Sequence, residues 1–384
     1  SPTVAPASSP TVAPSPAAPA TAADAARTMP LDVKVGQLIM AGFTGTTADA
    51  EAARLIEQHH IGNVVLLGRN VGAPADVLAL TDDLQRRAVA ANGQPLLIAI
   101  DQEGGRVQRF RPPFTQFPAA ATWGCAGAAH TEAVAAVMAR EMAAVGVNAG
   151  LAPVADVLTN PANTVIGDRA FSSDRALVAE HVLAAVAGLR EGGVLSTVKH
   201  FPGHGSTDGD SHDGPVVLAD SLADLEATEL VPFRAAAPVA DLMMTANVAY
   251  AALDPEDRPA SLSPPTIAFL RDDVGFNGVI ITDDLLMGAV ASRWDAGEAG
   301  VLALVAGADL LLYASGGAAV EAAQAVQRAV QDGRIPETRI DESLQRVLAL
   351  KGRLATSGRP PLDAVGSPEH QATVDALVRA GSRC

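Results

Sequence analysis

The amino-acid sequence predicts an α/β protein, built as a single (β/α)8 barrel behind a disordered N-terminal tether rich in Pro and Ala. Three observations predict this class. Short apolar segments alternate with helical patterns from residue 29 onward. Polar and ionisable residues recur where the apolar segments end. Residues 1–28, in contrast, are dominated by Pro, Ala, Ser and Thr.

The chain has 384 residues, of which 48% are hydrophobic and 18% are charged, enough to form a full core. Two Rossmann-like domains are the main alternative to one large barrel. No G-x-G-x-x-G motif follows the first apolar segment, however, and none of the Gly-rich turns is suited to hold a phosphate. The barrel is therefore the preferred prediction.

Most predicted strands are apolar throughout instead of alternating, as expected for parallel strands that are covered on both faces. The predicted strands are residues 36–42, 63–67, 96–101, 147–153, 195–200, 242–247, 278–283 and 308–313. Helical patterns lie between them, for example at residues 50–59, 75–90, 131–145, 174–191, 222–237 and 318–330. An amphipathic pattern at residues 338–351 predicts a closing helix.

The tether at residues 1–28 repeats the sequence SPTVAP, at positions 1–6 and 9–14. Such Pro-rich segments do not pack into a core and are partly polyproline-like. They commonly hold exported proteins away from a membrane or wall, and an ordinary disordered tail is the alternative. Because the sequence does not begin with Met, we expect a processed or truncated form. We therefore expect an extracytoplasmic protein, secreted or tethered to the cell envelope.

The formal charge of −16 disfavours binding to nucleic acid or to an anionic membrane, and is compatible with a small neutral ligand. Aromatic residues make up only 3% of the chain, which favours one sugar-sized pocket over a long polysaccharide cleft. Cys125 and Cys384 are too few for a disulfide scaffold or a Cys-based zinc site, and whether they pair is left open. No segment is apolar enough to predict a membrane span, and we expect a monomer.

Polar residues follow five of the predicted strands. They occur at residues 101–109, at Asp156 with 166–171, and at residues 199–212, 244–247 and 283–284. A carboxylate at the end of an apolar strand is costly to bury unless it is paired or used. Because the carboxyl ends of barrel strands meet at one rim, we expect a functional pocket there.

The densest of these segments is residues 199–212, KHFPGHGSTDGDSH. Its composition permits a metal-dependent hydrolase, and the candidate ligands are His200, His204, His212, Asp208 and Asp210. The same residues also permit acid/base catalysis by an Asp–His pair without a metal. Composition alone does not separate these two alternatives.

Four segments of the sequence, taken together, give a more specific indication of function. KHFPGHG followed by DGDSH, together with DQEGGRVQRF, IGDRAF and TDDLLMGA, resembles the single-barrel bacterial β-N-acetylglucosaminidases of glycoside hydrolase family 3. The resemblance spans residues 31–377, with the motifs in the family's order and spacing. It implies one catalytic domain over residues 29–384 that removes terminal β-linked N-acetylglucosamine from peptidoglycan- or chitin-derived fragments. It also implies retention through a covalent glycosyl–aspartate, without a metal or organic cofactor.

The resemblance assigns the chemical roles. Asp283 is the expected nucleophile, and Asp284 is expected to cap a helix that begins at Leu285. His212 is the expected acid/base, oriented by Asp210, because imidazole titrates near neutrality. The alternative for His212 is a surface histidine in a mobile loop.

The resemblance also implies a set of residues that hold the sugar: Asp101, Arg109, Arg169, Lys199 and His200. Their alternative role is a mutual ion-pair network, and the two roles are compatible. Glu103 and Asp168 are expected to support them, and His204 is expected to be structural. Many relatives have His at the position of Asn247, so this chain loses a titratable group there.

Three competing functions remain open on the sequence alone. A phosphorylase would use inorganic phosphate in place of water in the second step, since a neutral histidine repels phosphate less than a carboxylate does. A metal-dependent barrel hydrolase would use the histidines and aspartates of residues 199–212. A non-catalytic sugar-binding protein would need no reactive Asp283 or His212.

Overall fold

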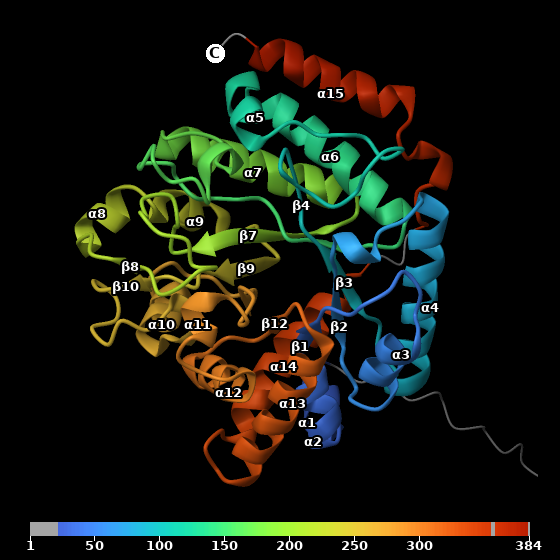
Figure 1. The fold of residues 1–384 in the computed structure, drawn as a ribbon, viewed down its shortest axis with the longest axis vertical. Coiled ribbons are helices and arrows are strands. Elements are labelled where there is room, and N and C mark those ends of the chain that lie inside the picture. The colour runs from blue at the N-terminus through green and yellow to red at the C-terminus, as the bar shows by residue number, and fades with distance from the viewer. Residues whose placement is uncertain (1–21, 355–357, 383–384) are drawn as a thin grey trace, which may run out of the picture.

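The computed structural model describes residues 22–354 and 358–382. Eight parallel strands run in the order β11-β9-β7-β6-β3-β2-β1-β12, with helices packed around them (Figure 1). The predicted single (β/α)8 barrel is therefore confirmed. Residues 1–21 of the predicted tether, and Cys384, lie outside the described residues. No helix in the described part of the chain is both long and apolar enough to cross a lipid bilayer.

Every predicted strand is present, although several are shorter than predicted. The barrel strands are β1 (Ile39–Ala41), β2 (Asn63–Leu66), β3 (Leu97–Ile100), β6 (Ala149–Gly150), β7 (Leu195–Phe201), β9 (Leu242–Thr245), β11 (Val279–Thr282) and β12 (Leu311–Tyr313). The strand predicted at residues 147–153 is reduced most, to Ala149–Gly150, and beyond it Val154 pairs with Lys199 only as an isolated bridge.

Two small sheets lie beyond the barrel strands and were not predicted. One is a hairpin of β4 (Gln102–Gly104) and β5 (Val107–Gln108), which follows β3 directly. The other pairs β8 (Val217–Leu218) with β10 (Ala249–Tyr250). Both extend loops at the carboxyl ends of the barrel strands, the end at which active sites of this fold are found.

The helices largely follow the predicted patterns. The longer ones that cover the barrel are α3 (Ala50–Glu57), α4 (Pro74–Asn92), α6 (Ala128–Ala144), α7 (Arg175–Glu191), α10 (Pro264–Asp272), α12 (Ala296–Ala306), α13 (Gly316–Gln331) and α14 (Glu337–Lys351). The short ones are α2 (Leu31–Gly36), α5 (Ala120–Ala126), α8 (Leu222–Ala227), α9 (Leu230–Ala236) and α11 (Gly288–Ala291), and α15 (Pro368–Gly381) closes the described chain. The helix predicted at residues 222–237 is split, because Thr228 leaves the helical conformation between α8 and α9.

The predicted boundary of the tether was wrong. Residues 22–28 form helix α1 (Ala22–Thr28), in which Ala26 is buried. The segment AADAART is rich in Ala, the strongest helix former, and contains none of the prolines that precede it. Figure 1 shows α1 at the foot of the barrel beside α2, α13 and α14.

The barrel closes between β11 and β12 without a regular ladder, and we call this junction the seam. The carbonyl of Ile280 accepts from the N–H groups of Asp309 and Leu310 at 2.8 and 3.0 Å. An isolated bridge joins Ile281 and Leu310. The N–H of Thr282 donates to the carbonyl of Leu310 at 3.0 Å, and the hydroxyl oxygen of Thr282 accepts from the N–H of Leu312 at 3.1 Å. A side-chain hydroxyl thus replaces a backbone acceptor beside Asp283.

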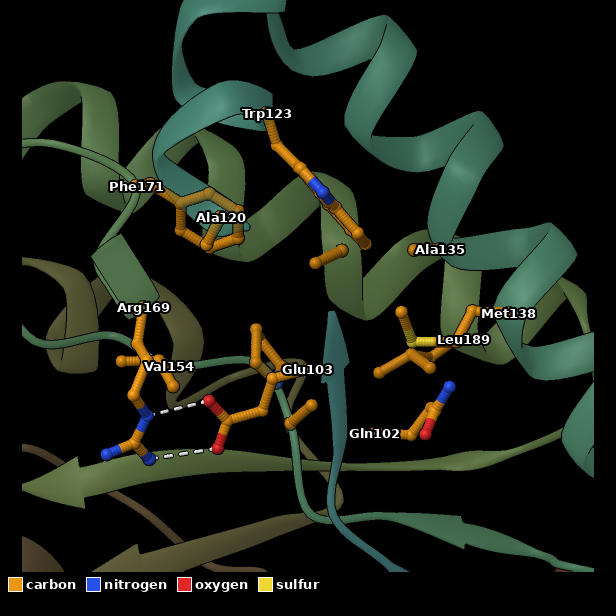
Figure 2. A pocket seen from close by; sticks show the side chains of 13 residues that line it. Gln102, Glu103, Ala120, Trp123, Ala135, Met138, Val154, Arg169, Phe171 and Leu189 are labelled. Atoms are coloured by element: carbon orange, nitrogen blue, oxygen red, sulfur yellow. Dashed lines mark hydrogen bonds and ion pairs between the residues drawn. The ribbon is translucent and has the colours of Figure 1, made fainter. Parts of the chain in front are cut away.

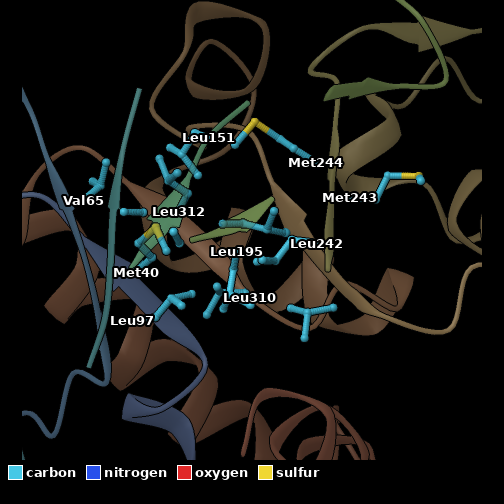
Figure 3. Packing of buried hydrophobic residues seen from close by; sticks show 14 of the residues in the cluster. Met40, Val65, Leu97, Leu151, Leu195, Leu242, Met243, Met244, Leu310 and Leu312 are labelled. Atoms are coloured by element: carbon cyan, nitrogen blue, oxygen red, sulfur yellow. The ribbon is translucent and has the colours of Figure 1, made fainter. Parts of the chain in front are cut away.

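The barrel interior is filled by aliphatic side chains instead of solvent. Figure 3 shows Leu97, Leu195, Leu242 and Leu310 gathered in one cluster, whereas Met243 turns to the other face of β9. These side chains are at most 7% exposed. Each fully buried Leu contributes about 1.5–3 kcal/mol by removing apolar surface from water, so the strand ends rest on a firm base.

Candidate active site

A buried lysine organises the mouth of the barrel. Lys199 lies near the end of β7, and its side chain is only 2% exposed. Its ammonium contacts Oδ1 of Asp101 at 2.8 Å and Oε1 of Glu103 at 2.6 Å. Asp101 follows β3, and Glu103 lies two residues further along, so alternation in the β4 hairpin directs both carboxylates to the same side.

Two arginines extend this ion-pair network. Arg169 binds Glu103 through two parallel bonds, Nε to Oε2 at 2.8 Å and Nη2 to Oε1 at 2.9 Å. Arg109 is held less firmly, with Nη2 3.4 Å from Oδ2 of Asp101 and a side chain that is 31% exposed. Two-point binding fixes the plane of the Arg169 guanidinium, whereas Arg109 remains free to turn toward a ligand.

The network keeps its members charged at neutral pH. Burial raises the pKa of Glu103, but the Lys199 and Arg169 cations outweigh this and hold it well below its usual range. The pKa of Asp101 is likewise lowered, because Lys199 outweighs its burial. Burial lowers the pKa of Lys199, but Asp101 and Glu103 bring it above its ordinary value. The result is a rigid set of charged donors and acceptors suited to sugar hydroxyls.

An apolar wall stands behind this network. Figure 2 shows the Glu103–Arg169 pair at the edge of a cavity whose other side is formed by Trp123, Phe171 and Met138. The cavity leaves about 20 Å³ for the centre of a water molecule, which is room for about one water. It is therefore too small for a sugar, and its effect is to exclude water from one side of the ion pair.

His200 joins the network from the same strand. Its Nδ1 lies 2.8 Å from Oδ2 of Asp156, and its Nε2 lies 3.5 Å from Nη2 of Arg169. Asp156 is fully buried, and burial raises the pKa of its carboxyl, but the interactions with His200 and His204 outweigh this and lower it. Asp156 thus fixes the orientation of the His200 ring.

The Asp–His pair predicted in the loop after β7 is formed. Nδ1 of His212 lies 2.7 Å from Oδ1 of Asp210, which also accepts the backbone N–H of His212 at 2.9 Å. The side chain of His212 is 61% exposed and that of Asp210 is 38% exposed. Burial raises the pKa of Asp210, but its bonds from His212 outweigh this and lower it. The Nε2 atom of His212 is therefore available to a ligand at the mouth of the barrel.

The backbone of this loop is bonded to the segment that follows Asp283. The carbonyl of His212 accepts from the N–H of Gly288 at 3.0 Å, and that of Ser211 accepts from the N–H of Ala289 at 3.0 Å. A Cβ at residue 288 would overlap the carbonyl of His212, so this approach requires glycine. The loop that carries His212 and the loop that carries Asp283 are therefore neighbours.

Asp283 and Asp284 directly follow β11 and lie in different environments. Asp283 is partly exposed, and its Oδ1 accepts the N–H of Asp284 at 2.7 Å. Asp284 accepts the N–H of Leu286 and that of Ala314, at 3.1 and 3.2 Å. Burial, with a smaller effect of the Asp283 charge, raises the pKa of Asp284 to about 6.

Asp284 is therefore structural, as predicted, but its predicted function as a helix cap was wrong. The next helix, α11, begins at Gly288 rather than at Leu285, and its N-cap is Met287. Residues 284–287 form a turn instead, which Asp284 stabilises by accepting the N–H of Leu286 and ties to the end of β12 by accepting the N–H of Ala314. A pattern that looks helical cannot distinguish one helical turn from the start of a helix.

Asn247 supports this turn from below. Its Nδ2 donates to the carbonyl of Asp284 at 2.8 Å, and the side chain is fully buried. Its Oδ1 has no hydrogen-bond partner. Asn247 thus acts on the backbone beside the carboxylates and does not itself project to the barrel mouth.

The residues proposed for a metal site do not gather around one point. Within the described ranges, no three His, Cys, Asp or Glu side chains have an arrangement that could hold a metal ion. Both ring nitrogens of His204 contact hydroxyls, and Asp208 binds Asn160. The ligand set that the sequence permitted is thus spread over separate hydrogen bonds.

Sequence reasoning gave Glu103 and Asp168 equal supporting roles, and the structure separates them. Glu103 binds both Lys199 and Arg169, whereas Asp168 pairs with Arg106 at the surface, at 3.1 Å. Asp156 was noted only as a polar strand end, without a role. Asp101 and Glu103 are two residues apart, and residues at this spacing in a strand point to the same side. This spacing could have identified Glu103 as a second carboxylate of the Lys199 network.

Comparison with known proteins agrees with this geometry. The family model for the glycosyl hydrolase family 3 N terminal domain matches residues 30–350. Beta-hexosaminidase LpqI of Mycobacterium tuberculosis is 34% identical over 340 residues, covering 85% of this chain and 84% of the relative. A beta-hexosaminidase of Alkalilimnicola ehrlichii is 39% identical over 293 residues, covering 74% of this chain and 82% of the relative.

A solved structure gives the same result. The glycoside hydrolase family 3 beta-N-acetylglucosaminidase from Paenibacillus sp. str. FPU-7 superposes with a TM-score of 0.88 and 39% identity, covering 92% of this chain and 69% of the other. The family match covers most of the chain, including β3, β7 and β11 and the polar residues that follow them. This chain therefore belongs to glycoside hydrolase family 3.

Proposed function

We propose that this protein is a retaining exo-β-N-acetylglucosaminidase. The observation that carries the proposal is the arrangement of the barrel mouth. The ring order puts β11, which Asp283 follows directly, four strands from β3, which Asp101 follows directly. In an eight-stranded barrel these strand ends lie across the mouth from each other, so a sugar held by the residues after β3 would face Asp283.

In this proposal the buried network binds the terminal sugar. Asp101, Lys199 and Arg169 supply charged partners for its hydroxyls, and His200 adds an imidazole edge. The network is already assembled and desolvated, so binding needs little rearrangement. A terminal sugar fits better than an internal one, because the ion pairs close the end of the site at β3.

The first chemical step forms a covalent bond. The carboxylate of Asp283 attacks the anomeric carbon while His212 gives its Nε2 proton to the leaving oxygen, and the glycosidic bond breaks. Asp284 helps by holding a proton up to about pH 6, so it adds little negative charge beside Asp283 below that pH. Asp210 accepts the Nδ1 proton of His212 and stabilises its charged form.

The second step releases the sugar. Neutral His212 takes a proton from water as the water attacks the anomeric carbon, and the bond to Asp283 breaks. Each of the two displacements inverts the configuration at the anomeric carbon, so the product retains the configuration of the substrate. The names of the relatives support N-acetylhexosamine as the sugar, and we propose terminal N-acetylglucosamine of peptidoglycan- or chitin-derived fragments as the substrate. A secreted or envelope-tethered enzyme of cell-wall turnover fits this substrate.

The decisive test replaces the nucleophile. Asp283→Ala should lower kcat/KM on an aryl N-acetyl-β-glucosaminide by about 10⁴-fold or more, without loss of the fold. Added azide should restore turnover and give the glycosyl azide of inverted configuration. The matched control is Asp272→Ala, an exposed aspartate in α10 that precedes β11 at the opposite end of the barrel. Turnover by Asp283→Ala at the level of this control would overturn the proposal.

The role of His212 has its own test. His212→Ala should slow the release of poor leaving groups by about 10²-fold or more, and that of dinitrophenolate much less, because a good leaving group needs no proton. Equal slowing for both would exclude His212 as the acid. Adding inorganic phosphate to the wild type and assaying sugar 1-phosphate distinguishes the hydrolase from a phosphorylase.

A further inference from the structure

A buried histidine inside the loop after β7 has no role in the chemistry proposed above. His204 is 3% exposed, and both its ring nitrogens contact hydroxyls of the same loop. Nδ1 lies 2.8 Å from Oγ1 of Thr207, and Nε2 lies 3.1 Å from Oγ of Ser211. Ser211 immediately precedes His212. We propose that His204 is a positioning residue that holds the acid/base His212 in place through Ser211, an inference that rests on the proposed role of His212.

The first part of the argument is that His204 itself is fixed. Its backbone N–H donates to Oδ1 of Asp156 at 2.8 Å, and the other oxygen of Asp156 binds the ring of His200. One fully buried carboxylate therefore ties His204 to the sugar-binding network. A Cβ at the neighbouring Gly205 would overlap the carbonyl of Val157, so the backbone lies tightly against the loop after β6.

The second part is the hydrogen-bond direction at the ring. The Thr207 hydroxyl donates to the carbonyl of His204 at 3.0 Å and accepts an amide proton of Asn163 at 3.2 Å. With its one proton used in this way, Thr207 accepts from Nδ1–H of His204. Nε2 is then unprotonated and accepts the hydroxyl proton of Ser211. Burial, which lowers the pKa of His204, favours this neutral ring.

The third part is what Ser211 holds. Ser211 is 1% exposed, whereas the side chains of Asp210 and His212 on either side of it are 38% and 61% exposed. Those two are bonded to each other, so their common position depends on the backbone between them. Ser211 fastens that backbone on one side to His204 and on the other, through its carbonyl, to the N–H of Ala289 beyond Asp283.

The same loop offers a matched control. The hydroxyl of Ser206 is also buried, but it has no hydrogen-bond partner. Ser211→Ala and Ser206→Ala thus make the same chemical change five residues apart in one loop, and only the first removes the bond to His204. A purely structural effect of deleting a buried hydroxyl would be common to both.

The experiment measures kcat/KM for each variant on two aryl N-acetyl-β-glucosaminides, one with a poor leaving group (phenolate) and one with a good one (dinitrophenolate). Ser211→Ala should lower the poor-leaving-group value about 10-fold, the usual effect of one hydrogen bond, and the other less than about 2-fold. Ser206→Ala should change neither. Because both substrates are read with the same enzyme preparation, their ratio does not depend on the fraction folded.

A double-mutant cycle completes the test. In the His212→Ala background, Ser211→Ala should have no further effect on either substrate, because the group that it positions is absent. A full 10-fold effect in that background, or equal effects of Ser211→Ala on both substrates, would overturn the positioning role. His212→Ala without any leaving-group dependence would instead reject the proposed acid/base itself, so the two failures are distinguishable.

Discussion

The two ends of the barrel each contain a buried lysine, and the two lysines are held in opposite ways. Lys199, at the mouth, contacts the carboxylates of Asp101 and Glu103. Lys351, at the end of α14, contacts only neutral acceptors, Oε1 of Gln37 and the carbonyl of Gly62, both at 2.7 Å. Both lysines are 2% exposed. Burial therefore does not decide their charge.

The groups that contact each lysine decide its charge. Carboxylates hold the pKa of Lys199 above its ordinary value despite burial, whereas burial alone lowers the pKa of Lys351 to about 7. At neutral pH Lys199 therefore stays charged at the mouth of the barrel, where a polar ligand can contact the network. Lys351, at the other end, is neutral in about half of the molecules. The comparison teaches that a charged site needs an assembled network, because a lone buried charge gives up its proton.

The largest effect is expected from removing the charge at the mouth. Lys199→Met leaves two buried carboxylates without their shared cation. We expect a loss of roughly 3–5 kcal/mol in the free energy of unfolding, since one partner of a buried network is removed. We also expect kcat/KM to fall at least about 10³-fold, because the sugar loses a charged partner. Urea unfolding and aryl-glycoside kinetics measure both, and a change below 1 kcal/mol (roughly the value of an exposed pair) would show that the network is not cooperative.

The exposed Asp210–His212 pair sharpens the comparison. Asp210→Asn should lower kcat/KM for poor leaving groups by about 10- to 100-fold, because the amide no longer stabilises the protonated ring of His212. The free energy of unfolding should change by less than about 1 kcal/mol, since the pair is exposed. Kinetics on a leaving-group series and urea unfolding test both parts. A large loss of stability would mean that the pair holds the loop together.

The third prediction concerns Lys351 and pH. The folded protein releases the Lys351 proton above about pH 7, whereas an unfolded lysine keeps its proton until about pH 10.4. The unfolded state therefore binds more protons in this window, and stability must increase with pH, by at most about 1.4 kcal/mol per pH unit. Lys351→Met should remove this increase between pH 8 and 9.5.

The control for this prediction is Lys34→Met. Lys34 is also 2% exposed, but Glu337 and Asp341 outweigh its burial and raise its pKa. Its removal should leave the increase between pH 8 and 9.5 in place. Urea unfolding at several pH values provides the measurement. If the free energy of unfolding rose equally steeply with pH in Lys351→Met and in the wild type, Lys351 would stay charged in the folded protein. The contrast between Lys199 and Lys351 would then be wrong.

The smallest effect is expected at Asp168. This aspartate pairs with Arg106, and both side chains are about half exposed. Asp168→Asn should change the free energy of unfolding by less than about 1 kcal/mol and kcat/KM by less than about 3-fold, because the pair lies outside the buried network. Glu103→Gln, tested beside it, should lower kcat/KM far more. Similar losses for the two variants would restore the equal supporting roles that the sequence suggested.

The sequence predicted the fold and the region of the site well, because both depend on periodic patterns. Apolar runs gave the strands, and their polar ends gave Asp101, Lys199 and Asp283 at the end of the barrel where loops carry function. It predicted poorly where local propensity and tertiary packing compete. The Ala-rich segment at residues 22–28 joins the folded domain, and the turn after Asp284 imitates a helix start.

The contacts within the site could not be predicted from pattern at all. The bond from His204 to Ser211 depends on the path of the loop between them, and the link from Asp156 to both histidines depends on how the loops after β6 and β7 pack. Neither has a period or a spacing that the sequence reveals. Such hydrogen bonds are set by backbone geometry, which residue types alone do not encode.

The Thr282 hydroxyl at the seam between β11 and β12 bears on how the barrel can open locally. The seam has one isolated bridge, between Ile281 and Leu310, whereas the other edge of β11 pairs with β9 in a regular ladder from Val279 to Thr282. We therefore expect the edge of β11 at the seam, next to Asp283, to open locally more often than the edge that pairs with β9. Amide-proton exchange along residues 280–283, faster than along β3, is the sign of such opening.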